Sequence, residues 1–456
     1  MKNYDVIVIG SGCGALISDE AASKGFKTAL IDKGPLIGGT CLNWGCIPSK
    51  MLIYVADRIV EIEEARKLGI DAEVKNVDFH AIVERMRKSR QESQAHIREG
   101  ISESKNLDFY EGECHFVSDY TLEVNGNKLK GGNIFIASGS RPFIPPIKGL
   151  ENIDYLTNES ALELRDRPDS LIIIGGGYIA VEYGHFFAAM GTQVTILEMA
   201  DRLVLSEEPE ISDVLKKELS KRMTVHNNSQ AEEVKANRNG VSVVTVDKKS
   251  GEERELTAQK IMMAVGRRSN ADLLQVERTG VELDNRGFIK VDEYMETSKK
   301  NIYAVGDANG RQMFTHMANR EAAIVVQNVF YGSRIKVDYT TVPHAVYSYP
   351  QIASVGLKEE EAKKNHESIV GRTKYFDIAK GEAMLEKEGY AKVIVEKGTD
   401  KILGFHIIGP HAPELIQEVV NAMTSGGHVE EINQGIHIHP ALSELVPTTL
   451  NSLGES

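Results

Sequence analysis

The stretch that decides the fold is residues 5–15, Asp-Val-Ile-Val-Ile-Gly-Ser-Gly-Cys-Gly-Ala. Residues 5–9 are an apolar, β-branched run, which is typical of a buried parallel strand. Residues 16–24 then read as a helix that ends near Gly25. A glycine-rich turn between a strand and a helix is the fingerprint of a dinucleotide-binding unit, so an α/β fold is expected.

Each position of this turn has a physical role. Gly10 permits the tight turn, Gly12 lets the backbone approach a pyrophosphate, and Ala15 packs the helix close to the sheet. A second strand, residues 28–31, ends at Asp32, about 20 residues further on, where an acid is expected to bind a ribose hydroxyl. Strand, turn, helix and acid together make the prediction specific.

The same pattern recurs later in the chain. Residues 171–174 are a second apolar run, followed by Gly-Gly-Gly-Tyr-Ile-Ala at 175–180, and a strand at 194–197 ends in Glu198. Two such units can hold two dinucleotides, as hydride transfer between a flavin and a nicotinamide requires. A second copy without a ligand is the alternative, which the complete fingerprint disfavours.

Glu198 indicates which nicotinamide nucleotide is used. A carboxylate at the end of this strand can accept a hydrogen bond from a ribose 2′-OH but would repel a 2′-phosphate. NAD is therefore expected rather than NADP, although Arg202 adds a positive charge four residues later.

Two of the four cysteines lie in residues 38–50, Gly-Gly-Thr-Cys-Leu-Asn-Trp-Gly-Cys-Ile-Pro-Ser-Lys. Cys41 and Cys46 stand at the entry to an expected helix, whose N-terminal N–H groups and dipole stabilise a thiolate, and Lys50 adds to this effect. Such a pair suits reversible disulfide chemistry. A zinc half-site or a structural bridge is the alternative, but no second cysteine pair completes a zinc site.

The composition excludes several classes of function. The 456 residues are enough for about three domains of ~150 residues each. The net charge of −13 argues against a nucleic-acid partner. Four cysteines are too few for a disulfide-rich secreted scaffold, no apolar run approaches the ~20 residues of a membrane span, and the chain enters a strand without a signal peptide. A cytoplasmic location without membrane attachment is expected.

Residues 38–50 also resemble the redox-active segment of the class I pyridine nucleotide-disulfide oxidoreductases, a flavin-dependent family. The resemblance extends over the whole chain, with motifs at 134–142, 262–268, 301–307 and 313–316 in the expected order. It implies two Rossmann-like domains, which bind FAD and NAD, and an α+β dimerisation domain. The implied boundaries are 1–145 and 269–340 for the FAD-binding domain, 146–268 for the NAD-binding domain and 341–456 for the dimerisation domain.

The resemblance also implies which residues bind the two cofactors. Lys50 is expected near the flavin N5 with Glu182 as its partner, and Tyr178 is expected to gate the nicotinamide pocket. The implied FAD residues are Gly10, Gly12, Ala15, Asp32, Lys33, Gly39, Thr40, Lys50, Cys114, Ala137, Ser138, Gly139, Asp307 and Thr315. The implied NAD residues are Gly175, Gly177, Tyr178, Ile179, Glu182, Glu198 and Gly266.

Residues 437–444, His-Ile-His-Pro-Ala-Leu-Ser-Glu, resemble the acid–base segment of the family. There His439 would exchange protons with a thiol substrate and Glu444 would orient it, which suits an imidazole that titrates near neutrality. In the family this pair serves the cysteines of the other subunit, so a homodimer is expected. A metal site at His437 and His439 is the alternative, but neither a cysteine nor a carboxylate completes a ligand set, and no metal is expected.

Within the family, dihydrolipoamide dehydrogenase is the predicted activity, with Cys41 attacked by the substrate and Cys46 facing the flavin. Glu198 favours NAD, Glu20 stands where glutathione reductases carry an arginine, and the C-terminal cysteine pair of mercuric reductases is absent. The partner would be the lipoyl domain of a 2-oxoacid dehydrogenase or glycine cleavage complex. Trp44 and Ala441 depart from the usual pattern, so a mycothione-, glutathione- or mercuric-reductase-like enzyme stays open, as does a flavin-binding structural subunit.

Overall fold

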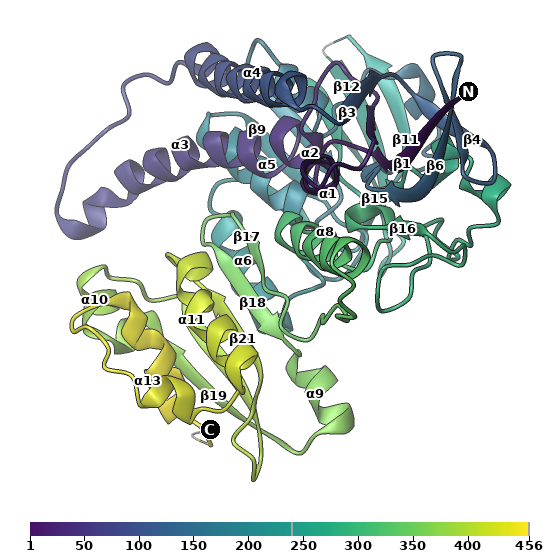
Figure 1. Cartoon of the computed structure of the whole chain (residues 1–456). Coiled ribbons are helices and arrows are strands. Elements are labelled where there is room, and N and C mark those ends of the chain that lie inside the picture. Colours follow the sequence, from purple (N-terminus) through teal and green to yellow (C-terminus); the bar gives the residue numbers. More distant parts are fainter. Residues whose placement is uncertain (239, 455–456) are drawn as a thin grey trace. The chain divides into compact units, whose positions relative to one another are not determined.

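The computed structural model describes residues 1–238 and 240–454 (Figure 1). The chain divides into two compact units. The first unit comprises Met1–Ser49, Val83–Phe143 and Gly266–Asp338, and the second comprises Lys50–Ile82, Ile144–Val265 and Tyr339–Ser456. Each unit is therefore built from three separate stretches of chain.

A seven-stranded sheet forms the centre of the first unit. The predicted first strand lies in its middle, because the apolar side chains of β1 are buried on both faces. β1 pairs in parallel with β2 and β6, placing Ile7 opposite Ala29 and Ile134. The strands are β1 (Lys2–Ile9), β2 (Thr28–Asp32), β3 (Leu107–Glu111), β4 (Cys114–Ser118), β5 (Thr121–Val124), β6 (Asn127–Ile136) and β16 (Ile302–Ala304).

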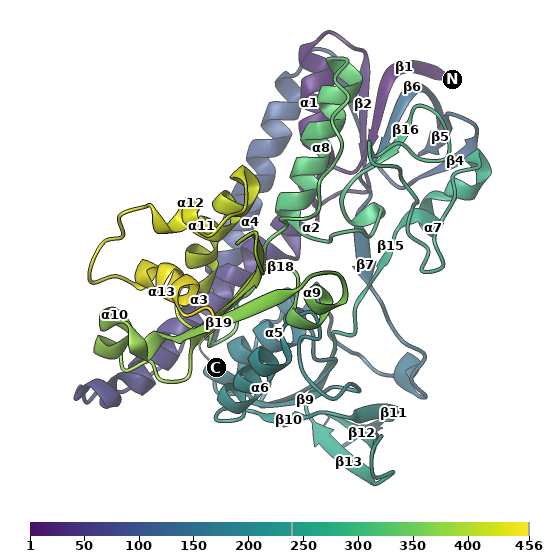
Figure 2. The same ribbon diagram turned by 90° about the horizontal axis from the view of Figure 1, so that it is seen from below.

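Two helices far apart in the sequence lie side by side in this unit. Figure 2 shows α1 (Gly14–Ser23), the helix of the glycine-rich turn, next to α8 (Thr315–Phe330). The unit also contains α2 (Gly39–Asn43), α7 (Ala271–Leu274) and the strand pair β7 (Ser140–Pro142) and β15 (Arg267–Ser269).

Two long helices run from one unit into the other. These are α3 (Cys46–Glu64) and α4 (Phe79–Glu103). The sequence predicts Asp78 as the N-cap of the second helix, and its Oδ1 accepts the Ala81 N–H at 2.9 Å. That prediction is confirmed.

The second unit repeats the strand–turn–helix motif. Its parallel sheet has the order β10–β9–β8–β14, and α5 (Tyr178–Ala189) follows β8. A three-stranded antiparallel sheet, β11–β12–β13, adjoins it in the chain. The bounds are β8 (Ser170–Ile174), β9 (Gln193–Leu197), β10 (Thr224–His226), β11 (Ser229–Asn237), β12 (Gly240–Asp247), β13 (Glu253–Ala258), β14 (Lys260–Met263) and α6 (Pro209–Leu219).

The C-terminal part of the second unit is a five-stranded antiparallel sheet covered by helices. The sheet order is β17 (His344–Val346), β18 (Ile352–Gly356), β21 (Ile402–Ile408), β20 (Tyr390–Glu396) and β19 (Ser368–Lys374). The residue pattern predicts strands at 342–347, 391–395 and 402–409 and a helix at 412–424. The structure has β17, β20 and β21 at these places, and α11 (Ala412–Ser425) corresponds to the helix. The other helices are α9 (Glu359–Asn365), α10 (Ala379–Ala383), α12 (Glu430–Asn433) and α13 (Leu445–Asn451).

The predicted fold class, two Rossmann-like α/β units and a C-terminal α+β domain, is confirmed. The four predicted domain segments stay a prediction. Across residues 1–238 and 240–454, no helix is long and apolar enough to cross a bilayer.

A buried lysine joins α6 to the five-stranded sheet within the second unit. The Lys392 side chain is 1% exposed, and its Nζ lies 3.0 Å from Glu208, 2.6 Å from Glu210 and 2.7 Å from Glu359. Removing one partner of a buried ionic cluster leaves uncompensated charge, which costs more than the cluster contributes.

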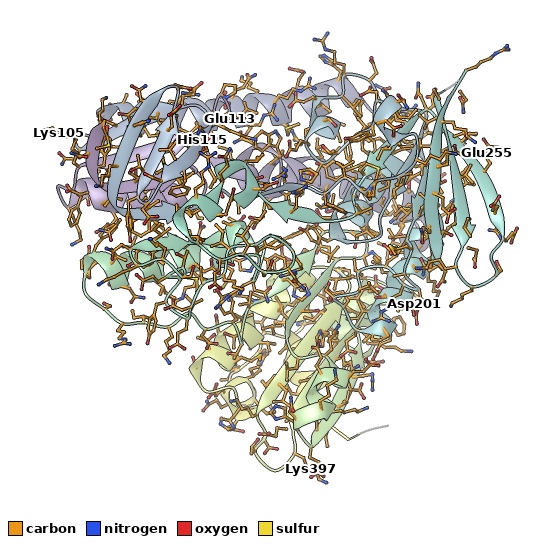
Figure 3. All side chains as sticks on the ribbon, turned by 90° about the vertical axis from the view of Figure 1, so that its right-hand side faces the viewer. Lys105, Glu113, His115, Asp201, Glu255 and Lys397 are labelled. Carbon is orange, nitrogen blue, oxygen red and sulfur yellow. The ribbon has the colours of Figure 1, made fainter. Side chains whose placement is uncertain are left out.

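We therefore expect Lys392→Met to lower the free energy of unfolding of this unit by about 3 kcal/mol, because the three carboxylates lose their shared cation. Urea unfolding followed by circular dichroism measures this. Lys397→Met is the matched control, because Lys397 is exposed at the surface (Figure 3) and pairs with an exposed glutamate, Glu367. Equal losses in the two variants would contradict the expectation.

Candidate active site

The glycine-rich turn of the first unit is held by backbone contacts that leave no room for a side chain. Gly10 has a φ of +104°, and a Cβ there would lie 2.2 Å from the Ala137 carbonyl oxygen. A Cβ on Gly39 would lie 2.6 Å from the Cα of Gly12, so the first residue of α2 lies directly against the turn. The turn and the predicted redox segment are therefore adjacent.

Asp32 accepts hydrogen bonds from residues on both sides of this contact. Its Oδ2 accepts the backbone N–H of Ser11 at 2.8 Å and the Ser11 hydroxyl at 2.5 Å, while Oδ1 accepts the Gly34 N–H at 3.2 Å. The Ser11 hydroxyl oxygen also accepts the Gly38 N–H at 2.8 Å. Ser11 was not identified as a site residue from the sequence. Its place between Gly10 and Gly12, with Asp32 at the end of the next strand, is the pattern that could have indicated it.

The other predicted FAD residues of this unit gather near the same place. The carboxyl ends of β1, β2 and β6 meet at one edge of the sheet, because these strands are parallel. Lys33 follows β2, and its Nζ lies 5.5 Å from the centre of the Trp44 ring. The remaining residues follow β6 or belong to α1, α2 and β4: Ala15, Thr40, Cys114, Ala137 and Gly139.

Cys41 and Cys46 come together with Thr315. Cys41 belongs to α2 and Cys46 is the first residue of α3, where its Sγ lies 3.4 Å from the Thr315 Oγ1. A hydrogen bond to the Cys46 side chain raises the pKa of the Cys41 thiol, and burial raises it further. The lowered pKa expected for the cysteines is therefore wrong for Cys41 in the reduced pair, because the two thiols bond to each other.

Of the two other cysteines, Cys114 is buried and Cys13 is partly buried. Burial raises the pKa of Cys13 to about 12 and the pKa of Cys114 to about 12. A thiol with such a pKa forms almost no thiolate at neutral pH, so neither residue suits redox chemistry.

Asp307 lies in a polar cluster that sequence reasoning identified only in part. Its Oδ2 accepts the Ser140 hydroxyl at 2.6 Å and lies 3.7 Å from the Nε of Arg267, which also donates to Ser140. Within the described residues, the buried Ser138 hydroxyl has no hydrogen-bond partner. Since buried hydroxyls are rarely left unpaired, this atom marks a place where a ligand could bond.

The second glycine-rich turn, at Gly175–Gly177 in the second unit, has its acid in contact with it. A Cβ on Gly176 would lie 2.7 Å from the Glu198 Oε2, and the Glu198 Oε1 accepts the Ala200 N–H at 2.6 Å. Gly177 precedes α5 and faces open space, whereas Tyr178 and Ile179 begin that helix. The Glu198 carboxylate and the N-terminus of α5 thus both lie next to the Gly175–Gly177 turn.

One of the predicted NAD residues lies in the first unit, and one of the predicted FAD residues lies in the second. Gly266 lies in the first unit, where its carbonyl accepts the Phe143 N–H at 2.9 Å. Lys50 lies in the second unit and donates to the Glu182 Oε2 at 2.8 Å. The Glu182 Oε1 accepts the Tyr347 N–H at 3.0 Å, so both carboxylate oxygens are bonded. The pair that the resemblance implies is present in the structure.

His439 and Glu444 form a second pair in this unit. The His439 Nδ1 lies 2.9 Å from the Glu444 Oε1, and the Glu444 Oε2 accepts the Ala441 N–H at 2.9 Å. The Ala441 N–H, and then His439, hold the pKa of Glu444 below its usual value. The His439 side chain is 70% exposed, so its Nε2 is accessible for proton transfer.

His437 does not join this pair. Its Nε2 lies 2.7 Å from the Glu418 Oε1 on α11. In the part of the chain that the structure describes, no group of three or more metal-ligating side chains is present.

Comparisons with known proteins agree with these features. Residues 4–322 match the model of the pyridine nucleotide-disulphide oxidoreductases, and residues 342–450 match the dimerisation domain of that family. The chain is 35% identical to the dihydrolipoyl dehydrogenase of Geobacillus stearothermophilus (97% of this chain, 94% of that protein). It is 34% identical to the mycothione reductase of Mycobacterium tuberculosis strain H37Rv (99% and 100%). The solved structure of the HOCl-induced flavoprotein disulfide reductase RclA of Escherichia coli aligns with a TM-score of 0.88 at 27% identity (98% and 99%).

In the reduced protein, we expect iodoacetamide to modify Cys46 first, because its side chain is exposed. Cys13 and Cys114 should stay unmodified until the protein unfolds, because their pKa of about 12 leaves few thiolates at pH 8. Mass spectrometry of the alkylated peptides over time measures this order. Early modification of Cys13 or Cys114 in the folded protein would contradict it.

Proposed function

Because the chain belongs to the pyridine nucleotide-disulphide oxidoreductase family, we propose that it oxidises protein-bound dihydrolipoamide to lipoamide with NAD+. Its family implies a flavoprotein disulfide oxidoreductase that uses FAD and a nicotinamide nucleotide, and its dimerisation domain supports a homodimer. The observation that carries the proposal is the contact between the Cys41 and Cys46 thiols at the start of α3.

The first unit has groups that fit FAD. The N-terminus of α1, which follows the Gly10–Gly12 turn, offers backbone N–H groups for a pyrophosphate. The unpaired Ser138 hydroxyl and the Asp307 carboxylate offer polar contacts nearby. When bound, FAD would take two electrons from the dithiol and pass them to the nicotinamide as a hydride.

The second unit has groups that fit NAD+. Gly177 leaves open space before the N-terminus of α5, which suits a pyrophosphate. Glu198 lies against Gly176, where its carboxylate would accept from a ribose 2′-OH and repel a 2′-phosphate. Lys50 would place its positive charge beside the flavin, and Glu182 would hold the ammonium in position.

The proposed reaction starts with a proton transfer. His439 accepts the proton of a substrate thiol at Nε2, while Glu444 holds Nδ1 and stabilises the imidazolium. The substrate thiolate attacks the Cys41 sulfur of the Cys41–Cys46 disulfide, which forms a mixed disulfide and releases Cys46 as a thiolate.

The second thiol of the substrate then attacks the substrate sulfur of the mixed disulfide, and its proton passes to the departing Cys41 sulfur. Cys41 leaves as a thiol, the substrate departs as a cyclic disulfide, and Cys46 stays a thiolate while His439 keeps the first proton, so both cysteines are reduced. Two electrons have passed from the substrate to the pair. In a homodimer, His439 would serve the cysteines of the other protomer.

Charge on α1 supports lipoamide over glutathione. Glu20 stands where glutathione reductases carry an arginine, and the Tyr331 hydroxyl donates to its Oε1. A carboxylate here would disfavour a disulfide that carries carboxylates, whereas lipoamide has none. The comparable identity to a mycothione reductase makes a reductase of a low-molecular-weight disulfide the second candidate.

The direct test is NADH formation from dihydrolipoamide and NAD+. We expect rapid turnover that Cys46→Ser abolishes, because no disulfide can then form. The same variant should keep most of its NADH-dependent dye reduction, which needs only the flavin. If NADH reduces the wild-type enzyme but dihydrolipoamide gives no turnover, the substrate assignment is wrong and the second candidate takes its place.

Replacing the acid of the second turn tests the choice of nucleotide. We expect Glu198→Ser to lower kcat/KM for NAD+ about 30-fold, because a charge-assisted hydrogen bond contributes about 2 kcal/mol. The value for NADP+ should rise as the repulsion is removed. Steady-state kinetics with both nucleotides measure the ratio, and Glu253→Ser, an exposed acid on β13, is the control. An unchanged ratio in Glu198→Ser would contradict the assignment.

A further inference from the structure

One buried amide lies between the two cysteines and bonds to the backbone around them. Asn43 is 0% exposed. Its Nδ2 donates to the carbonyl oxygens of Leu36 at 3.1 Å, Ile37 at 3.0 Å and Gly39 at 2.9 Å. These carbonyls belong to the loop and the first residue of α2 that lead to Cys41.

The side-chain oxygen and the backbone oxygen of Asn43 accept hydrogen bonds from α4. The Gln94 Nε2 donates to the Asn43 Oδ1 at 2.5 Å, and an Arg90 guanidinium nitrogen donates to the Asn43 backbone oxygen at 3.2 Å. Gln94 is 9% exposed and Arg90 is 7% exposed, so this network is shielded from water. A buried network of this kind fixes the geometry of its members.

The hydrogen bonds at position 43 need a side chain that both donates and accepts, as an amide does. The Nδ2 group donates to carbonyls while the Oδ1 accepts from Gln94, and a carboxylate could only accept. An apolar side chain would leave these carbonyls and the Gln94 amide without this partner, which costs free energy because the contacts are shielded from water. Asn43 thus fastens the Cys41 side of the segment to α4 by contacts that the proposed chemistry does not use.

We propose that Asn43 is a positioning residue, which Gln94 and Arg90 hold in place, and that it sets the reduction potential of the Cys41–Cys46 pair. The proposal rests on the proposed function, in which these cysteines form a reversible disulfide. A fixed Cys41 keeps a high effective concentration of one thiol beside the other, which favours ring closure. A loosened segment lowers that concentration, so the disulfide becomes easier to reduce.

The test equilibrates the flavin-loaded protein with dithiol–disulfide buffers of graded ratio and measures the disulfide by alkylation and mass spectrometry of the 41–46 segment. We expect Asn43→Ala and Gln94→Met each to lower the equilibrium constant for disulfide formation at least tenfold, which is about 30 mV. Gln94→Met keeps about the volume of the side chain and removes its amide, including the Nε2 donor to Asn43, so it carries the test if Asn43→Ala does not fold.

The next residue provides a local readout, because Trp44 is the only tryptophan of the chain. We expect Gln94→Met to lower the fluorescence anisotropy of Trp44 in the reduced protein, as the segment gains freedom. Thr121→Val is the matched control, since it removes a buried hydroxyl from β5 in the same unit without touching the redox segment. It should change neither the equilibrium constant nor the anisotropy.

The outcomes separate this proposal from the one that it rests on. If the wild-type pair forms a disulfide and Gln94→Met keeps its equilibrium constant within twofold, the positioning role is wrong and the proposed function stands, whatever the anisotropy does. If Thr121→Val shifts the equilibrium as much as Gln94→Met, the positioning role is also wrong. If the wild-type pair forms no disulfide at any buffer ratio, both proposals fail.

Discussion

The contact between Gly12 and Gly39 is the constraint on which the first unit depends. It brings the backbone of the dinucleotide-binding turn against the loop that leads to Cys41, at a separation that excludes any Cβ on Gly39. The bonds among Ser11, Asp32 and Gly38 hold the two loops in that contact. The turn that suits a pyrophosphate and the segment that carries the cysteines are therefore held in direct contact.

The second unit uses charge in a different way. Lys50 and Glu182 form a pair in which the carboxylate is almost fully buried and the lysine side chain is partly exposed. Lys392, by contrast, is enclosed by three carboxylates and joins α6 to the C-terminal sheet. The Lys50–Glu182 pair is thus open to solvent on the lysine side, whereas the Lys392 cluster is shielded from it and contributes to the stability of the unit.

Sequence patterns could predict both strand–turn–helix motifs, because local periodicity and glycine spacing encode them within about 30 residues. They could also indicate Asp78 as a helix cap and the spacing of His439 and Glu444. They could not reveal the bonds from α4 to Asn43 or the bond from Arg267 to Ser140, because these join residues more than 40 positions apart. The raised pKa of Cys41 was equally hidden, since it depends on a thiol–thiol contact and not on the helix alone.

The central claim is that Cys41 and Cys46 are a disulfide that NADH can reduce through the flavin. The most direct measurement is an anaerobic count of accessible thiols in the oxidised enzyme before and after one equivalent of NADH. Two new thiols are expected for each protomer, and they should map to Cys41 and Cys46. If flavin reduction occurs without any new thiol, the pair is not part of the electron path and the proposed function is wrong.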